Sequence, residues 1–329
     1  MYRRTQYGDL LLQAIQHDNE RKYDMTIDDW TEVLKRNNNF DAAYIQIGKA
    51  LYRQGKYEEA MEYYKSAYET ENYSDAWKEI RKEWASKYFW TIPLVLVVVF
   101  VLLGKFFGYA AKVNTRAALK VGRKSLKEEL LYAFHVIFHP FDGFWDLKHE
   151  KRGSMRSASV ILITTILVYF YNSIGKGYIF NPYTSYSDIF GAVSAVLAPL
   201  LLWVVANWCL TTLFEGEGSM RDIFIASCYC LTPLILLIFP STLLSHVLAA
   251  NEGGILTLMS TFAYLWLGIL LVLGMMVTHD YSVGKNLLTC LATIVGMAFI
   301  MFIGILFTSL MAKIVMFITQ IVEEIAFRL

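Results

Sequence analysis

Six long apolar runs are the feature that most constrains what this chain can fold into. They cover residues 88–104, 157–175, 189–214, 223–245, 253–278 and 286–312, and each is uncharged or nearly so. A helix needs about 17–25 such residues to cross the hydrocarbon core of a bilayer. Only 18% of the residues are charged, whereas soluble domains carry about 25%. The sequence therefore predicts an all-α, polytopic membrane helix bundle with six spans.

The charge balance and the cysteines exclude several classes of function. The chain has 30 Lys and Arg against 29 Asp and Glu, so no basic surplus is left to neutralise nucleic-acid phosphates. Its four cysteines all lie in apolar runs and are interpreted as small core residues, namely Cys209, Cys228, Cys230 and Cys290. We expect no nucleic-acid partner, no disulfide framework, no metal and no cofactor.

The first 87 residues predict a separate water-facing helical domain with an internal repeat. An offset of 34 residues aligns Ala14 with Gly48 and Trp30 with Tyr64, and such a period is typical of paired helices. The second copy, residues 43–68, resembles the tetratricopeptide repeat: Gly48 would permit close helix packing and Gly55 the turn. The resemblance implies a short tetratricopeptide-type domain over 1–87.

Two interpretations of this domain stay open at the level of sequence. In the first, a concave surface that includes Tyr44, Tyr57 and Tyr64 binds a peptide or another subunit. In the second, the domain is a rigid spacer next to the membrane. No cluster of Lys and Arg stands out against its mixed charge, so we expect no dedicated carboxylate site.

Charge in the short loops predicts how the chain is oriented. Residues 105–156 hold eleven Lys and Arg, and Arg221 and Lys285 fall in loops on the same side. The opposite side has only Lys176, Lys313 and Arg328. Because basic loops stay in the cytoplasm, we expect a plasma-membrane protein with cytoplasmic residues 112–156 and extracellular repeats. Residues 1–6 contain no apolar signal region, so we also expect the chain to be a fragment of a longer exported protein.

This pattern divides the chain into five parts. The repeat domain, 1–87, is followed by a first transmembrane helix at 88–111, a cytoplasmic linker at 112–156, a five-helix membrane domain at 157–312 and a C-terminal segment at 313–329. Apolar residues recur at helical spacing over 126–138 and over 314–325. Both stretches predict amphipathic helices that lie in the membrane interface, although the same stripes would also suit packing on another subunit.

Two aromatic groups are candidate interaction sites. Phe141, Phe144 and Trp145 follow the amphipathic helix of the linker and predict a rigid elbow that rests on lipid headgroups or docks a partner. Between the second and third spans an outer loop holds Tyr178, Phe180, Tyr183 and Tyr186. These rings could stack on sugars, or they could form an interfacial aromatic belt.

Motifs for chemistry are weak throughout. His135 and His139 are four residues apart, but no Glu stands between them as in a zinc-protease helix, and His279–Asp280 is interpreted as a solvated turn. None of the six runs carries a central charge, which ion-coupled transporters ordinarily need. Asn172 and Asn207 are interpreted as interhelical hydrogen-bonding residues. We therefore expect no enzymatic activity.

The membrane part resembles the Yip family, whose domain has five spans. Tyr229 and Pro233 keep the spacing of its GYxxxP feature, with Cys228 in place of glycine, and Gly216 and Gly218 resemble the turn that precedes it. The linker is similar to the bacterial branch, in which such domains follow tetratricopeptide repeats and an extracellular NHL-type propeller and accompany sugar ABC permeases. The resemblance implies a non-enzymatic accessory or scaffold subunit of an oligosaccharide ABC importer, with permease subunits, a solute-binding protein and membrane lipid as partners. The alternative is a stand-alone transporter or channel for a small solute or ion.

Overall fold

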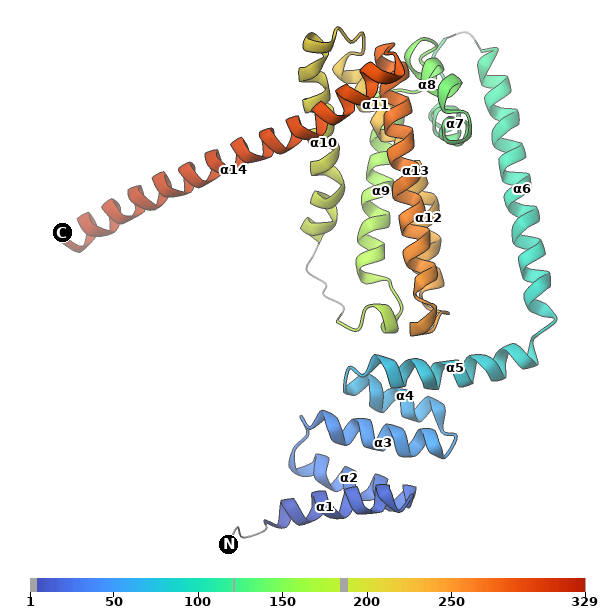
Figure 1. Cartoon of the computed structure of the whole chain (residues 1–329), viewed down its shortest axis with the longest axis vertical. Helices are drawn as coiled ribbons and strands as arrows, with labels where there is room; N and C mark the ends of the chain where they lie inside the picture. The colour runs from blue at the N-terminus through green and yellow to red at the C-terminus, as the bar shows by residue number, and fades with distance from the viewer. Residues whose placement is uncertain (1–4, 121, 184–188, 329) are drawn as a thin grey trace. The chain divides into compact units, whose positions relative to one another are not determined.

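A computed structural model describes residues 5–120, 122–183 and 189–328 of the chain (Figure 1). All regular elements in these ranges are helices, which confirms the all-α prediction. The helices fall into two compact units that are each discontinuous in sequence. The first comprises Met1–Phe106, Tyr171–Tyr186 and Ile238–Thr261, and the second comprises Phe107–Phe170, Ser187–Leu237 and Phe262–Leu329.

The helices are named in chain order. The N-terminal ones are α1 (Gln6–Asn19), α2 (Tyr23–Arg36), α3 (Asp41–Arg53), α4 (Tyr57–Ser66) and α5 (Thr70–Lys87), followed by α6 (Thr91–Ala118), α7 (Leu126–Phe138) and α8 (Pro140–Lys148). The remainder are α9 (Met155–Ile174), α10 (Ile189–Phe214), α11 (Met220–Cys230), α12 (Thr232–Leu244), α13 (Gly254–His279) and α14 (Val283–Arg328), with short 3₁₀ turns η1 (Tyr178–Phe180) and η2 (Ala250–Glu252).

Six segments of the described chain are long and apolar enough to cross a membrane, as the sequence predicted. They are Thr91–Ala118, Met155–Ile174, Ile189–Thr211, Met220–Leu244, Ala250–His279 and Val283–Phe327. The fourth combines α11 and α12, which meet at Leu231, two residues before Pro233. The protein is therefore a multi-pass membrane protein whose spanning helices contact lipid.

The helices α1 to α5 stack side by side in chain order within the first unit (Figure 1). The positions paired by the 34-residue offset occupy equivalent places in the core, because Ala14 and Gly48 are both buried and Trp30 and Tyr64 are only 4% and 1% exposed. A side chain at Gly48 would come within 2.6 Å of the Tyr64 ring. The small residue at this position is thus what lets α3 and α4 approach closely.

Spans that cross a membrane in alternation place every second connection on the same side. The connections within each unit follow this pattern. In the first unit, α5 contacts the turns η1 and η2, which follow the second and fourth spans. In the second unit, Lys148 of α8 pairs with Glu217 after the third span at 2.9 Å. The His279 ring, at the end of the fifth span, accepts a hydrogen bond from the Gly218 amide at 3.2 Å.

The first transmembrane helix is longer than the sequence predicted. We expected it to end at residue 111, but α6 continues to Ala118. Its last turns bury Ala110, Asn114 and Ala117, and the Asn114 amide donates to the Leu131 carbonyl of α7 at 3.3 Å. Packing against α7 therefore extends the helix into the predicted linker.

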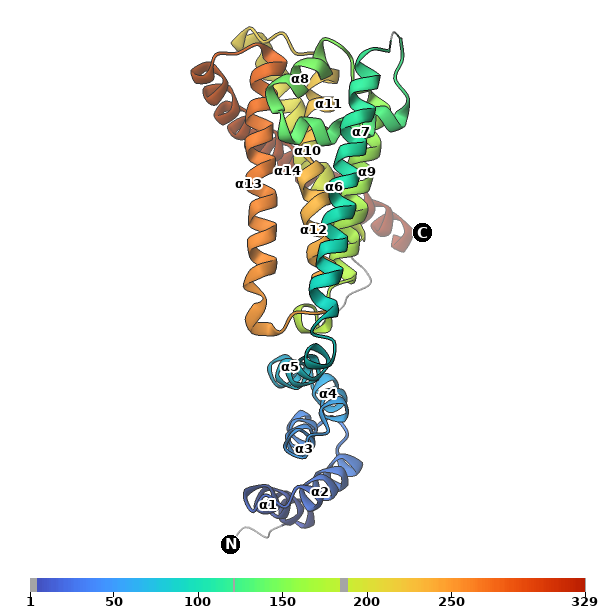
Figure 2. The ribbon, with the colours of Figure 1, turned by 90° about the vertical axis from the view of Figure 1, so that its right-hand side faces the viewer.

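Residues 126–150 form two ordered helices that pack within the second unit (Figure 2). A capping box begins α7, since the Ser125 amide donates to Glu128 at 2.6 Å and the Glu128 amide donates to the Ser125 hydroxyl at 3.3 Å. The apolar stripe predicted to face lipid is divided between two environments: Leu126 and Phe138 are exposed, whereas Ile137 is only 3% exposed. One face of α7 therefore packs in its own unit while another stays exposed.

The C-terminal segment is not a separate helix. The sequence predicted the last span at 286–312 and an interfacial helix after it, but α14 is one continuous helix of 46 residues. After Gly304, this helix contains no further glycine or proline that could break it. Its first part packs on α10, whereas every residue from Met301 to Phe327 is exposed, and this part extends away from the other helices of its unit (Figure 1).

We predict that Gly48→Val destabilises the N-terminal helices by about 1–3 kcal/mol, because the added methyl groups would overlap the buried Tyr64 ring. Hydrogen exchange of α3 and α4 amides in the full chain would measure the loss. Gly8→Ala is the matched control, since its nearest neighbour lies at an ordinary 3.4 Å. Equal protection in both variants would contradict the prediction.

Candidate functional site

The Tyr229 side chain is the centre of a buried polar junction in the second unit. Tyr229 is fully buried, and its hydroxyl oxygen lies 2.8 Å from the Glu129 carbonyl oxygen of α7 and 3.0 Å from the Ser157 hydroxyl of α9. A side chain at Gly153 would come within 2.9 Å of the same hydroxyl. One residue of α11 therefore links α7 and α9, and the glycine before α9 leaves room for it.

Pro233 completes the local geometry at the junction of α11 and α12. Proline has no N–H, so the usual helical donor to the Tyr229 carbonyl is missing. The Thr232 hydroxyl takes its place and donates to that carbonyl oxygen at 2.8 Å. In a membrane each unsatisfied backbone group costs several kcal/mol, which explains why a hydroxyl residue precedes the proline.

Glu129 places a carboxylate in the same junction. Its residue is 2% exposed, the Ser154 hydroxyl donates to one carboxylate oxygen, and Arg156 donates to the other at 3.3 Å. A buried charge is tolerated only where it is paired and hydrogen-bonded. Glu129 therefore holds the start of α9 against α7.

Arg152 provides a second buried charge next to the first. It is 6% exposed, donates to the Asn114 carbonyl of α6 at 2.7 Å, and lies 4.4 Å from the centre of the Tyr132 ring. The Tyr132 hydroxyl donates to Asp146 at 2.6 Å, and burial followed by this carboxylate raises the pKa of Tyr132. The tyrosine thus stays a neutral donor, and α6, α7 and α8 are joined through one guanidinium group.

The two glycines of the turn before α11 make room for a buried histidine. A side chain at Gly216 would come within 2.5 Å of His279 Nδ1, and one at Gly218 within 2.9 Å of its ring. Because the Gly218 amide donates to Nδ1, Nε2 carries the proton and donates to Asn207 at 2.8 Å. His279 is 1% exposed, so our interpretation of it as a solvated turn residue was wrong.

Asn207 extends this network to α14 by donating to the Thr293 hydroxyl at 3.0 Å. In the first unit the Thr242 hydroxyl lies 3.0 Å from Asn172. Both asparagines thus form interhelical hydrogen bonds, which confirms the sequence interpretation.

His135 and His139 form a packing pair on α7. Their rings stack with centroids 4.7 Å apart. Burial lowers the pKa of His135, and the neighbouring His139 lowers it further. His135 is therefore neutral at neutral pH and contributes ring packing to this face of α7.

The three aromatics of the predicted elbow separate in the structure. Phe144 is 1% exposed and packs over Gly274, where an added side chain would meet its ring at 3.0 Å. Phe141 and Trp145 are about half exposed and line a shallow depression with His149. Phe144 therefore belongs to the core, and only the other two remain available to a partner or to lipid.

Aromatic residues of the predicted outer loop pack against α5 and its preceding turn in the first unit. Tyr178 lies against Tyr73, with ring centroids 4.6 Å apart, and Tyr183 stacks on Tyr68 at 5.0 Å. Tyr186 lies outside the described residues. The two described tyrosines thus make intramolecular contacts, which neither the sugar-stacking nor the aromatic-belt interpretation anticipated.

An ion pair strengthens the same contact between α5 and the loops. Arg81 donates to both carboxylate oxygens of Glu252, at 2.5 and 2.7 Å, and also to the Val247 carbonyl at 2.9 Å. The Ala250 amide donates to the Ser74 hydroxyl at 2.8 Å. Bidentate pairing fixes orientation as well as distance, so these contacts set the angle at which α5 lies on the loops.

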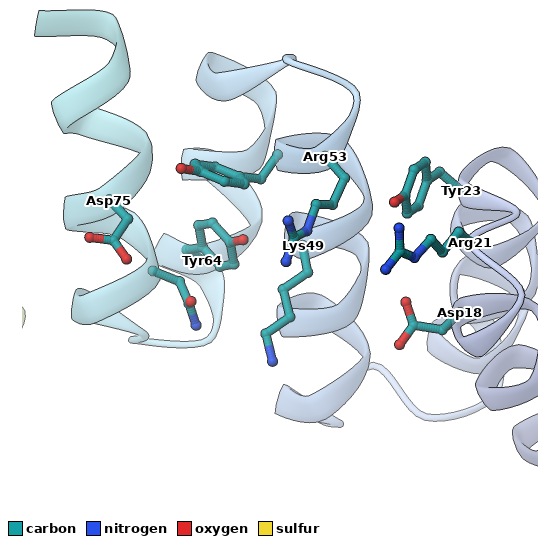
Figure 3. A pocket seen from close by; sticks show the side chains of 9 residues that line it. Asp18, Arg21, Tyr23, Lys49, Arg53, Tyr64 and Asp75 are labelled. Atoms are coloured by element: carbon teal, nitrogen blue, oxygen red, sulfur yellow. The ribbon is translucent and has the colours of Figure 1, made fainter. Parts of the chain in front are cut away.

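A groove of about 420 Å³ opens along the N-terminal helices. Figure 3 shows Lys49 and Arg53 of α3 between Arg21 on one side and Asp75 of α5 on the other. The complete lining is Asp18, Arg21, Tyr23, Lys49, Tyr52, Arg53, Tyr64, Asn72 and Asp75. Three cations spread over 33 positions thus come together, contrary to our expectation that no such cluster exists.

The tyrosines chosen from sequence contribute unequally to this groove. Tyr64 lines it but is almost fully buried, whereas Tyr44 donates to the Asn38 carbonyl at 3.0 Å and Tyr57 packs edge-on against Tyr52. The repeat offset could have identified Tyr23, which aligns with Tyr57. No sequence signal singled out Arg21 or Lys49.

A family model described as the Yip1 domain matches residues 134–316, more than half of the 329 residues. The chain belongs to the Yip1 domain family. No curated protein and no solved structure matches the chain significantly. The Yip1 domain match begins within α7 and ends within α14, so it contains Tyr229, Pro233 and the glycines of the turn before them.

We predict that Tyr229→Phe lowers the free energy of unfolding by about 1–3 kcal/mol, because it leaves the buried Glu129 carbonyl without its partner. Thermal unfolding in mild detergent would measure the change. Tyr109→Phe, on the exposed face of α6, should be neutral. A neutral Tyr229→Phe would show that the hydroxyl does not hold the junction.

Gly218→Ala should destabilise the second unit, since its Cβ would lie within 3.0 Å of Thr278 and His279. We expect a loss of about 1–3 kcal/mol, again by thermal unfolding. Gly268→Ala is the control, because no atom lies within 4 Å of the added carbon and alanine favours a helix interior by about 1 kcal/mol. The prediction fails if both substitutions shift the melting temperature alike.

Proposed function

We propose that this Yip1-domain protein is a non-enzymatic membrane scaffold that binds an acidic segment of a partner protein in its N-terminal groove. The observation that carries the proposal is the set of three groove cations. Arg21, Lys49 and Arg53 are exposed and have no ion-pair partner among the described residues. Unpaired cations in a concave surface attract carboxylates and give orientation to the bound chain.

The tyrosines of the groove support a peptide as the ligand. Tyr23 and Tyr52 lie between the charged residues, and such rings combine apolar contact area with a hydrogen-bonding hydroxyl. Asp18 adds an acceptor to the lining, whereas Asp75 is already paired with Lys78 at 2.8 Å, so the groove cations select an acidic segment. The repeats would then be the tetratricopeptide-type domain that the sequence resembles.

The contacts of α5 explain why a groove of this kind would be joined to a membrane domain. The bidentate Arg81–Glu252 pair and the Ser74–Ala250 hydrogen bond hold α5 on the loops of the spans. A partner bound in the groove would therefore be held at a defined angle to the membrane surface. This favours a scaffold over a flexible tether.

The finer proposal names the partner. By resemblance to bacterial Yip proteins, the scaffold would be an accessory subunit of an oligosaccharide ABC importer in the plasma membrane, and the groove would bind the permease or the solute-binding protein. The alternative of a stand-alone transporter is less favoured, because Asn207 and Asn172 are occupied by interhelical hydrogen bonds. A liposome flux assay with the isolated chain separates these two functions.

The groove can be tested with a labelled peptide. We expect a fluorescent Asp- and Glu-rich decapeptide to bind the full chain with an affinity that falls as salt rises. The double variant Lys49→Glu, Arg53→Glu should bind at least about tenfold more weakly, because like charges would face the peptide. Lys35→Glu is the control outside the groove lining. Equal binding of a Gln- and Asn-containing peptide would refute the charge-based mechanism.

The orientation gives a further prediction. With Cys209→Ala as background, a cysteine at Lys56 should react with a membrane-impermeant maleimide in intact cells, whereas one at Arg123 should react only after permeabilisation. The reason is the excess of basic residues in 105–156. The reverse labelling would place the groove in the cytoplasm and remove the solute-binding protein as a partner.

A further inference from the structure

A second cavity lies among the spanning helices of the second unit. It has a volume of about 250 Å³ and is lined by α9, α10, α11, α12, α13 and α14, with Leu231 between α11 and α12. Its described lining residues are all uncharged, and most are aliphatic. Ala195, Pro199 and Tyr264 are exposed, so the cavity opens between α10 and α13 on a surface that faces lipid.

Two buried polar atoms in this wall lack hydrogen-bond partners within the described part of the chain. They are the Trp203 indole Nε1 and the Ser227 hydroxyl. Trp203 is 9% exposed and Ser227 is fully buried, and both residues line the cavity. Burying an unsatisfied donor destabilises a fold, and in hydrocarbon no water is present to satisfy it. A partner for these atoms is therefore missing at this position.

Pro199 leaves a hydrogen-bond acceptor in the same wall. Proline lacks an N–H, so the helix cannot supply the usual donor to the Ala195 carbonyl. Both residues line the same cavity. The indole can only donate a hydrogen bond and the carbonyl can only accept one. A hydroxyl group is the small function that can do both at once.

We propose that this cavity is a binding site for an uncharged, single-chain lipid that carries a hydroxyl group. The volume lies below the roughly 300–1,000 Å³ of sites for drug-sized ligands, which suits one chain and not a two-chain lipid. The uncharged lining excludes an anionic head group, because nothing described in the wall would pair with it. The lipid hydroxyl accepts from the Trp203 indole, with Ser227 beside it, and donates to the Ala195 carbonyl, while the chain lies along the aliphatic wall.

The site is separate from the scaffold groove, so its test is independent of the proposed function. The full chain in mild detergent is titrated with 1-decanol, decane or decanoate, and the melting temperature reports binding. We expect 1-decanol to raise the melting temperature more than the other two probes. Trp203→Phe and Ser227→Ala should each weaken the apparent Kd for 1-decanol about tenfold, as the loss of one hydrogen bond to a buried group implies.

A tryptophan on the same helix provides the matched control. Trp208 of α10 is 46% exposed and does not line the cavity, so Trp208→Phe should leave the response to 1-decanol unchanged. Trp203→Phe removes an orphaned donor, and its melting temperature without probe should equal or exceed that of the parent chain. Equal effects of decane and 1-decanol, or equal effects of the two Trp substitutions, would overturn the proposal. So would a Trp203→Phe variant that is destabilised without probe but binds 1-decanol like the parent chain.

Discussion

The hydroxyl of Tyr229 joins three helices, α7, α9 and α11, at one buried point. This hydroxyl lies between the Glu129 carbonyl of α7 and the Ser157 hydroxyl of α9. The backbone carbonyl of Tyr229 accepts a hydrogen bond from the Thr232 hydroxyl, because Pro233 has no N–H to donate. In a membrane there is little hydrophobic drive between helices, so packing and such hydrogen bonds determine which helices associate. Tyr229 and Pro233 thus have a direct physical purpose. They end α11 and secure the two helices beside it.

Two charged side chains, Glu129 and Arg152, are buried near the same junction. Glu129 and Arg152 are only 2% and 6% exposed, yet each is paired or hydrogen-bonded, to Arg156 and Ser154 in one case and to Asp146 and the Asn114 carbonyl in the other. Removing one member would leave the other charge buried without compensation. These residues therefore specify one arrangement of α6, α7, α8 and α9. Polar residues at this junction thus hold the helices in place.

In the first unit, α5 lies on the turns that follow the second and fourth spans. This contact includes the Arg81–Glu252 ion pair and the stacked rings of Tyr183 and Tyr68. Planar groups lose little conformational freedom when they stack or pair. The groove opposite can then carry exposed cations, because the attachment of the domain does not use them.

Sequence periodicity and charge by themselves indicated six spans and a helical N-terminal domain with a 34-residue repeat, and a resemblance around Tyr229 and Pro233 indicated the family. These properties depend on local composition and spacing, which hydrocarbon thickness and helix geometry restrict to few solutions. Only the tertiary structure decided which groups meet. Arg21 and Arg53 share a groove although 32 positions separate them, Phe144 turned inward, and His279 met Asn207 across 72 positions. Such long-range pairings arise from how helices pack, and the pattern of one helix does not record the face that its neighbour will cover.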